Sequence, residues 1–589
     1  MGLKGKSTDH GSNAPIKTCC TVLRYWHYLL LFLPAIMLAI VTARHGIVFT
    51  FNEFESWGAY MQAYNLLHFD PTRTFLLADD TFLPGKQVDH PYVYVSNPWM
   101  IPRLTSAALQ LLGVTNFLIS NLVICLVLYT TVCILIITTF APTSSVIKYF
   151  IAFLILDYFG FFRSIGNSAS AWHYLLFFFC LYSTLAAKQA RVLMIFSSFF
   201  LLWQFLIHFA IFTSLTCLIA LCLTKEPRTR VDQNFWNTIA WICTGSALSL
   251  SIFIGQLLAY LGGFRNIYNR FIETVAERNN DRIEEAPRRF VDLVNLYDRS
   301  DRIWSMPADS WQLLRHTAAN AVAQYGDLLC IIVVIGLAGG LFIFVLRGIT
   351  PKLILPHARN FEGALKNAPY FEIRVLLASA ISYIAVGALF KGQVYQINVY
   401  HYHPMLFPVL SLGAAIGADL ISKVAQRALK VSVPLKGGAI VNAIVFIAFA
   451  ALCIRASAHN YEKYPSIDGD GFWSLYEKRY RGMQFSLQIP YGELVWNSTG
   501  VVPFYVNNIV RPNLEETEKL AHSDYVFCID HWSAQKSRPK WTPIMSCHEM
   551  GRELITQGHQ LTASGISYVI IKLDKTVYTS SGEKLIHPR

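Results

Sequence analysis

Two glutamates, Glu53 and Glu55, follow the first long apolar segment of the chain, in FTFNEFESWGAYMQ. A carboxylate at the mouth of a membrane bundle could deprotonate an acceptor hydroxyl or hold a divalent cation. Residues two apart share a face of a strand but not of a helix, so only one of the pair needs to point into a site. The pair is also typical of solvated acids at the start of a helix, where negative charge is favourable.

Other ionisable residues could bind a substrate near these glutamates. Asp79 and Asp80 form a pair that could bind a metal, although such a pair is also ordinary turn chemistry. His173 lies within an apolar segment, where an ionisable group is costly and is a functional candidate, or a core histidine with its partners satisfied. The candidate substrate-binding residues are Tyr60, Asp79, Asp80, His90, Arg103, Arg163 and His173.

A second polar group could bind phosphate. Lys391, His401 and His403 lie in KGQVYQINVYHYHP, just before and inside a late apolar segment. Arg265 and Arg270 begin an arginine-rich stretch, and the planar fork of arginine suits a lipid phosphate. The segment around His401 could instead be an interfacial belt of Tyr and His. The arginine-rich stretch could instead be a solvated amphipathic helix with i,i+4 ion pairs.

The composition predicts a multi-pass membrane protein. Apolar residues make up 54% of the 589 residues and charged residues only 15%, whereas soluble domains carry about 25% charged residues. About eleven segments are long enough to cross about 30 Å of hydrocarbon. They are 23–43, 116–140, 147–163, 171–187, 191–208, 209–224, 237–260, 327–346, 375–390, 404–422 and 437–455. The run 191–224 has no clear turn signal between its two segments.

Basic residues predict the orientation, because Lys and Arg in short loops favour the cytoplasmic side. With eleven spans and a cytoplasmic N-terminus, the basic clusters all fall on that side, including Lys423, Arg427, Lys430 and Lys436 after the tenth segment. The net charge of +12 is then orientation charge that can also contact membrane lipids, and it needs no nucleic-acid partner. The loops predicted to lie outside the cytoplasm are 44–115, 261–326, 391–403 and 456–589.

The chain divides into three parts. We predict a cytoplasmic tail over 1–22, a helical membrane bundle over 23–455, and an extracytoplasmic α/β domain over 456–589. In the first outer loop, helical spacing predicts short helices over 53–67 and 105–114.

The C-terminal domain is predicted from alternating segment types. Its strands are 492–506, 523–529 and 566–573, and its helices are 513–522 and 547–558. Cys528 and Cys547 could pair in an oxidising compartment or remain free thiols, and Asn497 begins a glycosylation sequon.

Three stretches resemble the GT-C glycosyltransferases, closest to bacterial relatives of the protein O-mannosyltransferases and to the lipid A aminoarabinose transferases. They are NEFESWGAYMQAYNLLH, DHPYVYVSNPWMIPRLTSAALQLLGV and VYHYHPMLFPVLSLGAAIGADL. The resemblance implies a GT-C-like fold and inverting transfer of a sugar from a polyprenyl-phosphate donor to a glycan, lipid or protein acceptor at the extracytoplasmic face. It favours a bacterial inner membrane, with the endoplasmic reticulum membrane as the alternative.

The resemblance also implies roles for individual residues. Glu53 or Glu55 would take the position of the base, although the family's adjacent acids are spread here to Glu-x-Glu. His401 or His403 would stand near the carrier phosphate, where many relatives have arginine. Some relatives bind a divalent metal, so Mg or Mn is a possible cofactor.

Two other functions are open. A transporter or flippase would use buried ionisable groups to line a path. A non-catalytic assembly subunit would keep the fold without the site. The sequence contains no Walker loop, HExxH, CxxC or GxSxG motif.

Overall fold

The structure is a computed structural model of the whole chain. The residues that it describes are 54–79, 93–95, 97–114, 117–140, 145–156, 168–187, 189–224, 233–270, 314–315, 317–319, 321–322, 325–349, 369–389, 399–430, 437–463, 485–488, 525–529, 548, 552, 555–556, 558–564, 568–572 and 574. The predicted first span 23–43, the predicted elements 492–506 and 513–522, Asn497 and Cys547 lie outside the described residues.

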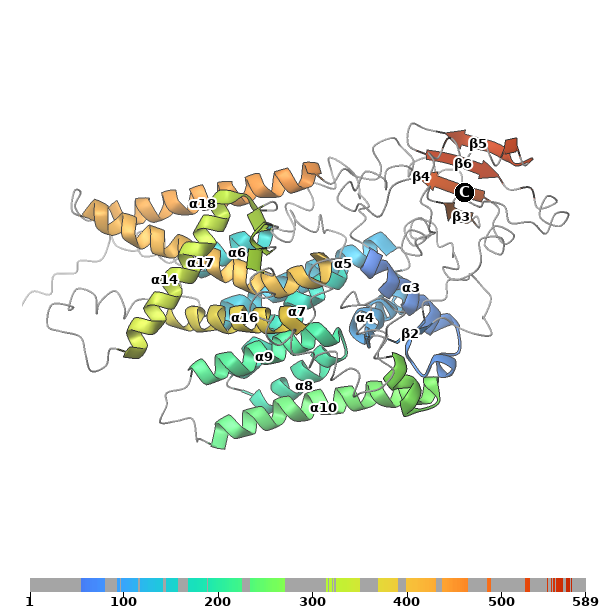
Figure 1. The fold of residues 1–589 in the computed structure, drawn as a ribbon, viewed down its shortest axis with the longest axis horizontal. Helices are drawn as coiled ribbons and strands as arrows, with labels where there is room; N and C mark the ends of the chain where they lie inside the picture. The colour runs from blue at the N-terminus through green and yellow to red at the C-terminus, as the bar shows by residue number, and fades with distance from the viewer. Residues whose placement is uncertain are drawn as a thin grey trace, which may run out of the picture.

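A bundle of apolar helices forms the bulk of the described chain (Figure 1). Its helices are α5 (Phe117–Thr139), α6 (Ile147–Leu156), α7 (Ser168–Leu185), α8 (Arg191–Trp203), α9 (Ile207–Thr224), α10 (Gln233–Leu261), α14 (Asp327–Ile349), α16 (Tyr370–Leu389), α17 (Val399–Lys430) and α18 (Gly437–Lys463). Each predicted apolar segment between 116 and 455 overlaps one of these helices. The total of eleven spans stays a prediction, because 23–43 is outside the described residues.

Four helices of the described chain are long and apolar enough to cross a membrane. They are the helical stretches Asn234–Leu261, Asp327–Leu346, Tyr370–Gly387 and Pro404–Ala428, and five shorter apolar helices accompany them. Large apolar side chains remain exposed on them, including Trp236 and Ile331. Helices that expose such side chains are suited to the apolar interior of a bilayer, as expected for a multi-pass membrane protein.

The apolar run 191–224 is divided by contacts from a distant loop. Helix α8 ends at Trp203 and α9 begins at Ile207. The main-chain N–H of Met100 donates to the carbonyl of Gln204 at 2.9 Å, and that of Trp99 donates to the carbonyl of Phe205 at 3.2 Å. A helix end leaves such groups unpaired, so these bonds stabilise the break.

The described part of the predicted first outer loop folds into a compact unit at one end of the bundle. It contains α3 (Phe54–His68), a 3-10 helix η3 (Pro71–Thr74), β1 (Ala78–Asp79), β2 (Val93–Tyr94) and α4 (Met100–Leu111). The two strands pair antiparallel, with Ala78 opposite Tyr94. The predicted helices over 53–67 and 105–114 correspond to α3 and α4, although α4 begins earlier than predicted.

The C-terminal part contains a four-stranded sheet with the order β3–β4–β6–β5. Its strands are β3 (Phe485–Gln488), β4 (Tyr525–Ile529), β5 (Gln560–Ser564) and β6 (Tyr568–Lys572). Strands β3 and β4 are parallel, and the other two pairs are antiparallel. Strands β4 and β6 lie within the predicted 523–529 and 566–573, whereas β3 and β5 were not predicted. The sheet lies toward the same end of the bundle as α3 and α4 (Figure 1).

Helices α14 and α17 approach closely through glycine. A Cβ atom added to Gly336 would lie 1.9 Å from the carbonyl oxygen of Gly413, and one added to Gly417 would lie 2.0 Å from that of Ile332. Small residues allow membrane helices to pack backbone against backbone. Because the clashing atoms belong to the backbone, a side chain here must push the helices apart.

We predict that Gly336→Ala lowers the free energy of unfolding by about 1–3 kcal/mol, as overpacking of a tight interface does. Thermal unfolding of the purified protein in lipid nanodiscs measures the change. The matched control is Gly255→Ala on α10, where an added Cβ has nothing within 4 Å. The control should leave the melting temperature unchanged or raise it slightly. Equal melting temperatures for both variants would contradict the close approach of α14 and α17.

His559 makes the stability of the sheet region depend on pH. Its Nδ1 accepts a hydrogen bond from the main-chain N–H of Asp574 at 3.1 Å, which requires a ring with Nδ1 unprotonated. Burial lowers the pKa of His559, and the Asp574 carboxylate partly opposes this shift. The unfolded chain therefore binds this proton more readily, so the contribution of His559 is present above about pH 6.5 and is lost as the pH falls.

We predict faster amide hydrogen exchange in peptides covering 559–574 at pH 5 than at pH 7.5, after correction for the intrinsic exchange rate. Hydrogen–deuterium exchange of the full chain measures this. His559→Asn should reduce the pH dependence, because its amide oxygen can accept the same bond and does not titrate. Exchange protection that is independent of pH in the unsubstituted protein would contradict the assignment.

Candidate active site

Helix α3 places one of the two predicted catalytic glutamates. Glu55 lies in its first turn, where the helix dipole favours a negative charge. Glu53 lies outside the described residues.

One face of α3 is packed into the protein. Ala59, Tyr60, Gln62, Ala63 and Asn65 are buried, so the helix is half-buried. Helix α3 contacts α4 and α7. This packing fixes the direction in which its first turn projects.

Tyr60 is positioned between α3 and α4. Its main-chain carbonyl accepts a hydrogen bond from Nε2 of Gln110 at 2.9 Å. Burial, with a smaller effect of Tyr64, raises the pKa of Tyr60 to about 12, because the phenolate would be poorly solvated. At neutral pH Tyr60 therefore carries a proton and can donate to a substrate oxygen but cannot act as a base.

The hairpin of β1 and β2 presents Asp79. Nδ2 of Asn65 on α3 donates to the main-chain oxygen of Asp79 at 3.0 Å. The hairpin is also held against α10 by an apolar cluster of Leu77, Val93, Phe253 and Leu257. The half-buried Asp79 side chain is near enough to Tyr260 of α10 for an electrostatic interaction. Asp80 and His90 lie between the two strands, outside the described residues.

Arg103 has a partner in the protein backbone. It is only 2% exposed, and its Nη2 donates to the carbonyl of Leu76 at 2.7 Å. Phe75 and Leu76 both have positive φ angles, 50° and 63°, which are unfavourable for residues with a Cβ atom. Arg103 thus stabilises a strained turn just before β1, and this gives it a positioning role besides the predicted substrate contact.

His173 lies in an aromatic environment at the same end of the bundle. Its ring is fully buried and packs edge-on against Phe205 and Phe209, each with a centroid distance of 4.7 Å. Trp99 in turn stacks on Phe205, with their ring centroids 5.0 Å apart. The loop before α4, the α8–α9 turn and the start of α7 therefore form one packed unit around this histidine.

Three positioning residues were missed by sequence reasoning. Oδ1 of Asn97 accepts from the main-chain N–H of Ile207, the first residue of α9, at 3.1 Å. Nε2 of Gln204 donates to the carbonyl of Ser249 on α10 at 3.0 Å. The third residue is Gln110, whose Nε2 donates to the main-chain carbonyl of Tyr60. Asn97 precedes a proline, and this turn signal was the available clue.

The predicted phosphate-binding residues come from two places. His401 and His403 lie in the first turns of α17, whose Phe407 packs against Tyr174 of α7 at a centroid distance of 4.5 Å. Arg265 and Arg270 lie in a helical segment after α10 and are exposed and half-buried, respectively. Lys391 and Arg163 lie outside the described residues.

The arrangement brings some candidates together. Tyr60, Asp79 and Arg103 share the packed first outer loop, and α7 joins this loop, through α3, to the helix that carries His401 and His403. No group of three or more His, Cys, Asp or Glu residues occurs within the described part of the chain. A divalent cation stays a prediction, for which the sequence offered the carboxylates of Glu53, Glu55, Asp79 and Asp80.

Comparison with known proteins finds similar solved structures, two of which are structures of ArnT. No protein-family model matches the chain, and no curated protein is found to match it. The apo structure of ArnT from Cupriavidus metallidurans is 12% identical, with a TM-score of 0.39, over 93% of this chain and 98% of that one. ArnT from the same organism bound to undecaprenyl phosphate is 10% identical, with a TM-score of 0.36, over 92% of this chain and 97% of that one. ArnT is a lipid A aminoarabinose transferase, of the family that the sequence motifs resemble.

We predict that Arg103→Met destabilises the protein by about 2–3 kcal/mol, because it removes the buried charged donor and its hydrogen bond to the Leu76 carbonyl. Arg103→Lys should recover part of the loss. Thermal unfolding in nanodiscs measures both.

The matched control is Arg265→Met, which removes the same charge from an exposed position. This control should leave the melting temperature unchanged. An equal effect of the two substitutions would show that the bond from Arg103 to Leu76 does not stabilise the loop.

Proposed function

We propose that the protein is an inverting membrane glycosyltransferase that uses a polyprenyl-phosphate-linked sugar and acts on the extracytoplasmic face. One observation carries the proposal. The helix with Glu55 in its first turn is packed, together with the Asp79 hairpin and α4, at one end of an apolar helix bundle. The sequence motifs that resemble the GT-C glycosyltransferases lie in these elements and at the start of α17.

The proposed reaction needs one base and a stabilised leaving group. The carboxylate of Glu53 or Glu55 takes the proton of an acceptor hydroxyl. The acceptor oxygen forms a bond to the anomeric carbon while the bond from that carbon to the carrier phosphate breaks. The electron pair leaves with the phosphate, so the products are an inverted glycoside and free polyprenyl phosphate.

Cationic and hydrogen-bonding groups would stabilise the departing phosphate. The candidates are Lys391, His401, His403, Arg265 and Arg270. Preorganised donors of this kind contribute more in a site that excludes water than in solution. A protonated Tyr60 and the Asp79 carboxylate would orient the sugar or acceptor, and a divalent cation, if bound, would add positive charge near the phosphate.

The bundle suits a substrate with a long apolar tail. Helices with exposed apolar side chains, such as Ile331, Val334 and Phe342 on α14, allow a polyprenyl chain to lie against the protein within the bilayer. The polar acceptor would arrive from the outer side, where the loop and the C-terminal sheet lie. The proposed location is a bacterial inner membrane, with the endoplasmic reticulum membrane as the alternative.

We predict that the purified protein in vesicles releases polyprenyl phosphate from one member of a panel of labelled polyprenyl-phosphate hexoses and pentoses. Glu53→Gln or Glu55→Gln should lower kcat by about 100–10,000-fold, because the amide cannot accept the proton. Combined substitution of His401 and His403 by Ala should mainly raise the KM for the donor.

The controls separate chemistry from folding. Each variant is compared by thermal unfolding, and Asp70→Asn provides an acidic residue on the exposed part of the same loop whose loss should leave turnover intact. If no donor is consumed by folded protein, but labelled lipid or sugar crosses the vesicle, the transporter alternative is supported. If the folded protein shows neither turnover nor transport, the non-catalytic subunit is favoured.

A further inference from the structure

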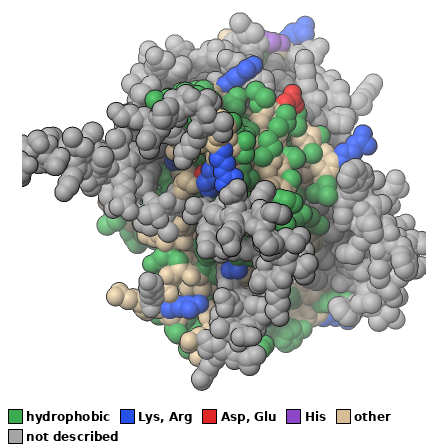
Figure 2. All heavy atoms as spheres, turned by 90° about the vertical axis from the view of Figure 1, so that its left-hand side faces the viewer, with side chains coloured by type: hydrophobic (Ala, Val, Ile, Leu, Met, Phe, Trp, Pro, Cys, Tyr) green, Lys and Arg blue, Asp and Glu red, His purple; other side chains and the backbone are tan. Residues whose placement is uncertain are grey.

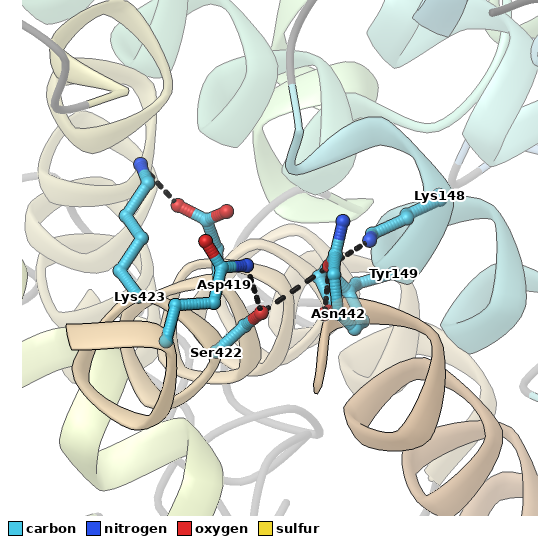
Figure 3. A network of polar contacts seen from close by, with 7 residues as sticks. Lys148, Tyr149, Asp419, Ser422, Lys423 and Asn442 are labelled. Carbon is cyan, nitrogen blue, oxygen red and sulfur yellow. Dashed lines mark hydrogen bonds and ion pairs between the residues drawn. The ribbon is translucent and has the colours of Figure 1, made fainter. Parts of the chain in front are cut away.

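A polar network joins three helices away from the candidate active site (Figure 3). Oδ1 of Asn442 on α18 accepts hydrogen bonds from Nζ of Lys148 on α6, from the hydroxyl of Tyr149 at 3.3 Å and from the hydroxyl of Ser422 on α17 at 3.2 Å. Nζ of Lys423 forms an ion pair with the buried Asp419 carboxylate at 2.7 Å. This set of residues is called the Asn442 network below.

Lys148 is the unusual member of the network. The residue is only 9% exposed, and its ammonium lies 4.6 Å from the ring centroid of Tyr149 and 5.7 Å from that of Phe446. An ammonium group carries three N–H donors, and one of them is used by Asn442. The described part of the chain offers no acceptor to the other two.

The network has donor groups without acceptors and more positive than negative charge. Asn442 uses its oxygen for three donors, whereas no described residue accepts from its amide N–H₂ group. The single carboxylate of Asp419 forms an ion pair with Lys423 and also interacts electrostatically with Lys148, so two ammonium groups share one negative charge. A nearly buried cation without a full set of acceptors is costly, and an anion with several oxygens would satisfy it.

The network lies toward the end of the bundle opposite the first outer loop. Ser422 is separated from His401 by about 30 Å along α17, at 1.5 Å per residue. Figure 2 shows this end, where Lys and Arg side chains are spread over the described surface and acidic side chains are sparse. The side chains of Lys423, Asn442 and Gln426 are partly exposed, so the network is reachable from the membrane boundary.

We propose that the Asn442 network binds the phosphate of an anionic phospholipid headgroup. The phosphate oxygens would accept from the unused N–H groups of Lys148 and from the amide N–H₂ of Asn442. The chemistry is that of phosphate, and the basic surface around it favours an anionic membrane leaflet. This site is independent of the proposed sugar transfer, which uses groups at the other end of α17.

The test compares lipid binding by native mass spectrometry and by thermal unfolding in nanodiscs. Phosphatidylglycerol, mixed into phosphatidylcholine, should raise the melting temperature of the unsubstituted protein above its value in phosphatidylcholine alone. Lys148→Met should abolish most of this difference and weaken phosphatidylglycerol binding by about tenfold, since it removes a charged donor of similar length. Lys572→Met, an exposed lysine on β6, is the charge-matched control.

Asn442→Asp separates ligand binding from folding. The carboxylate keeps the acceptor for Lys148, Tyr149 and Ser422, so the internal bonds remain. It replaces the N–H₂ group by a negative oxygen, so phosphate should be repelled. We therefore expect Asn442→Asp to fold at least as well as the unsubstituted protein in phosphatidylcholine and to lose the stabilisation by phosphatidylglycerol.

The outcomes are distinct. Equal losses of melting temperature in both lipids, with the phosphatidylglycerol difference retained, would overturn the proposal and leave the network as an internal staple between α6, α17 and α18. Unchanged lipid preference in Asn442→Asp would overturn it as well. Inorganic phosphate at millimolar concentration is added in phosphatidylcholine nanodiscs. If inorganic phosphate raises the melting temperature as phosphatidylglycerol does, the site binds phosphate and a soluble anion can supply it. If only phosphatidylglycerol raises the melting temperature, the lipid is the source of the phosphate.

Discussion

The hydrogen bonds between the loop before α4 and the turn between α8 and α9 are the constraint on which the end of the bundle around α3 and α4 depends. Asn97, Trp99 and Met100 pair with Ile207, Phe205 and Gln204 across more than a hundred residues of sequence. Helix α8 has 13 residues and so spans about 20 Å, less than the roughly 30 Å of a bilayer core. Backbone groups that are left unpaired at the ends of such a helix would be costly in the bilayer core. The loop supplies the missing partners.

This constraint determines where the candidate site can be. A loop that is bonded to helix ends has a defined position, and side chains on such a loop can be aligned with groups on the helices. Asp79 is held by Asn65 and by the apolar cluster on α10, and Arg103 braces the turn that precedes it. The buried polar atoms of this loop are thus part of its framework. The same framework supports α3, whose first turn contains Glu55.

The sequence predicted the helices well where apolar length decides the outcome, and less well where distant contacts decide it. The segments at 116–140 and 237–260 match α5 and α10 within a few residues. Helices α4 and α17 begin earlier than predicted, since Pro102 is tolerated in a first turn and Pro404 and Pro408 lie inside a helix that neighbouring helices support. Strand β5 is mostly polar, with the sequence QLTAS, and has no apolar pattern from which a strand could be predicted.

The site was predictable in its residue types but not in their roles. Arg103 looked like a substrate ligand from its charge, whereas its bond to the Leu76 carbonyl depends on a turn that no local pattern reveals. Asn97 and Gln204 act on backbone groups far away in sequence, so their spacing gave no signal. Glu55 was proposed from a local feature, its position after an apolar segment and at the start of a helix, and its catalytic role stays a prediction.

The most direct test of this account is cryo-electron microscopy of the protein in nanodiscs that contain a polyprenyl phosphate. The account predicts that the carrier phosphate is seen at the end of the bundle that holds α3 and the first turn of α17, within reach of His401 or His403, with the lipid tail against the apolar helices. A carrier phosphate resolved elsewhere, or along a path between the two ends of the bundle, would contradict a glycosyltransferase site at this end.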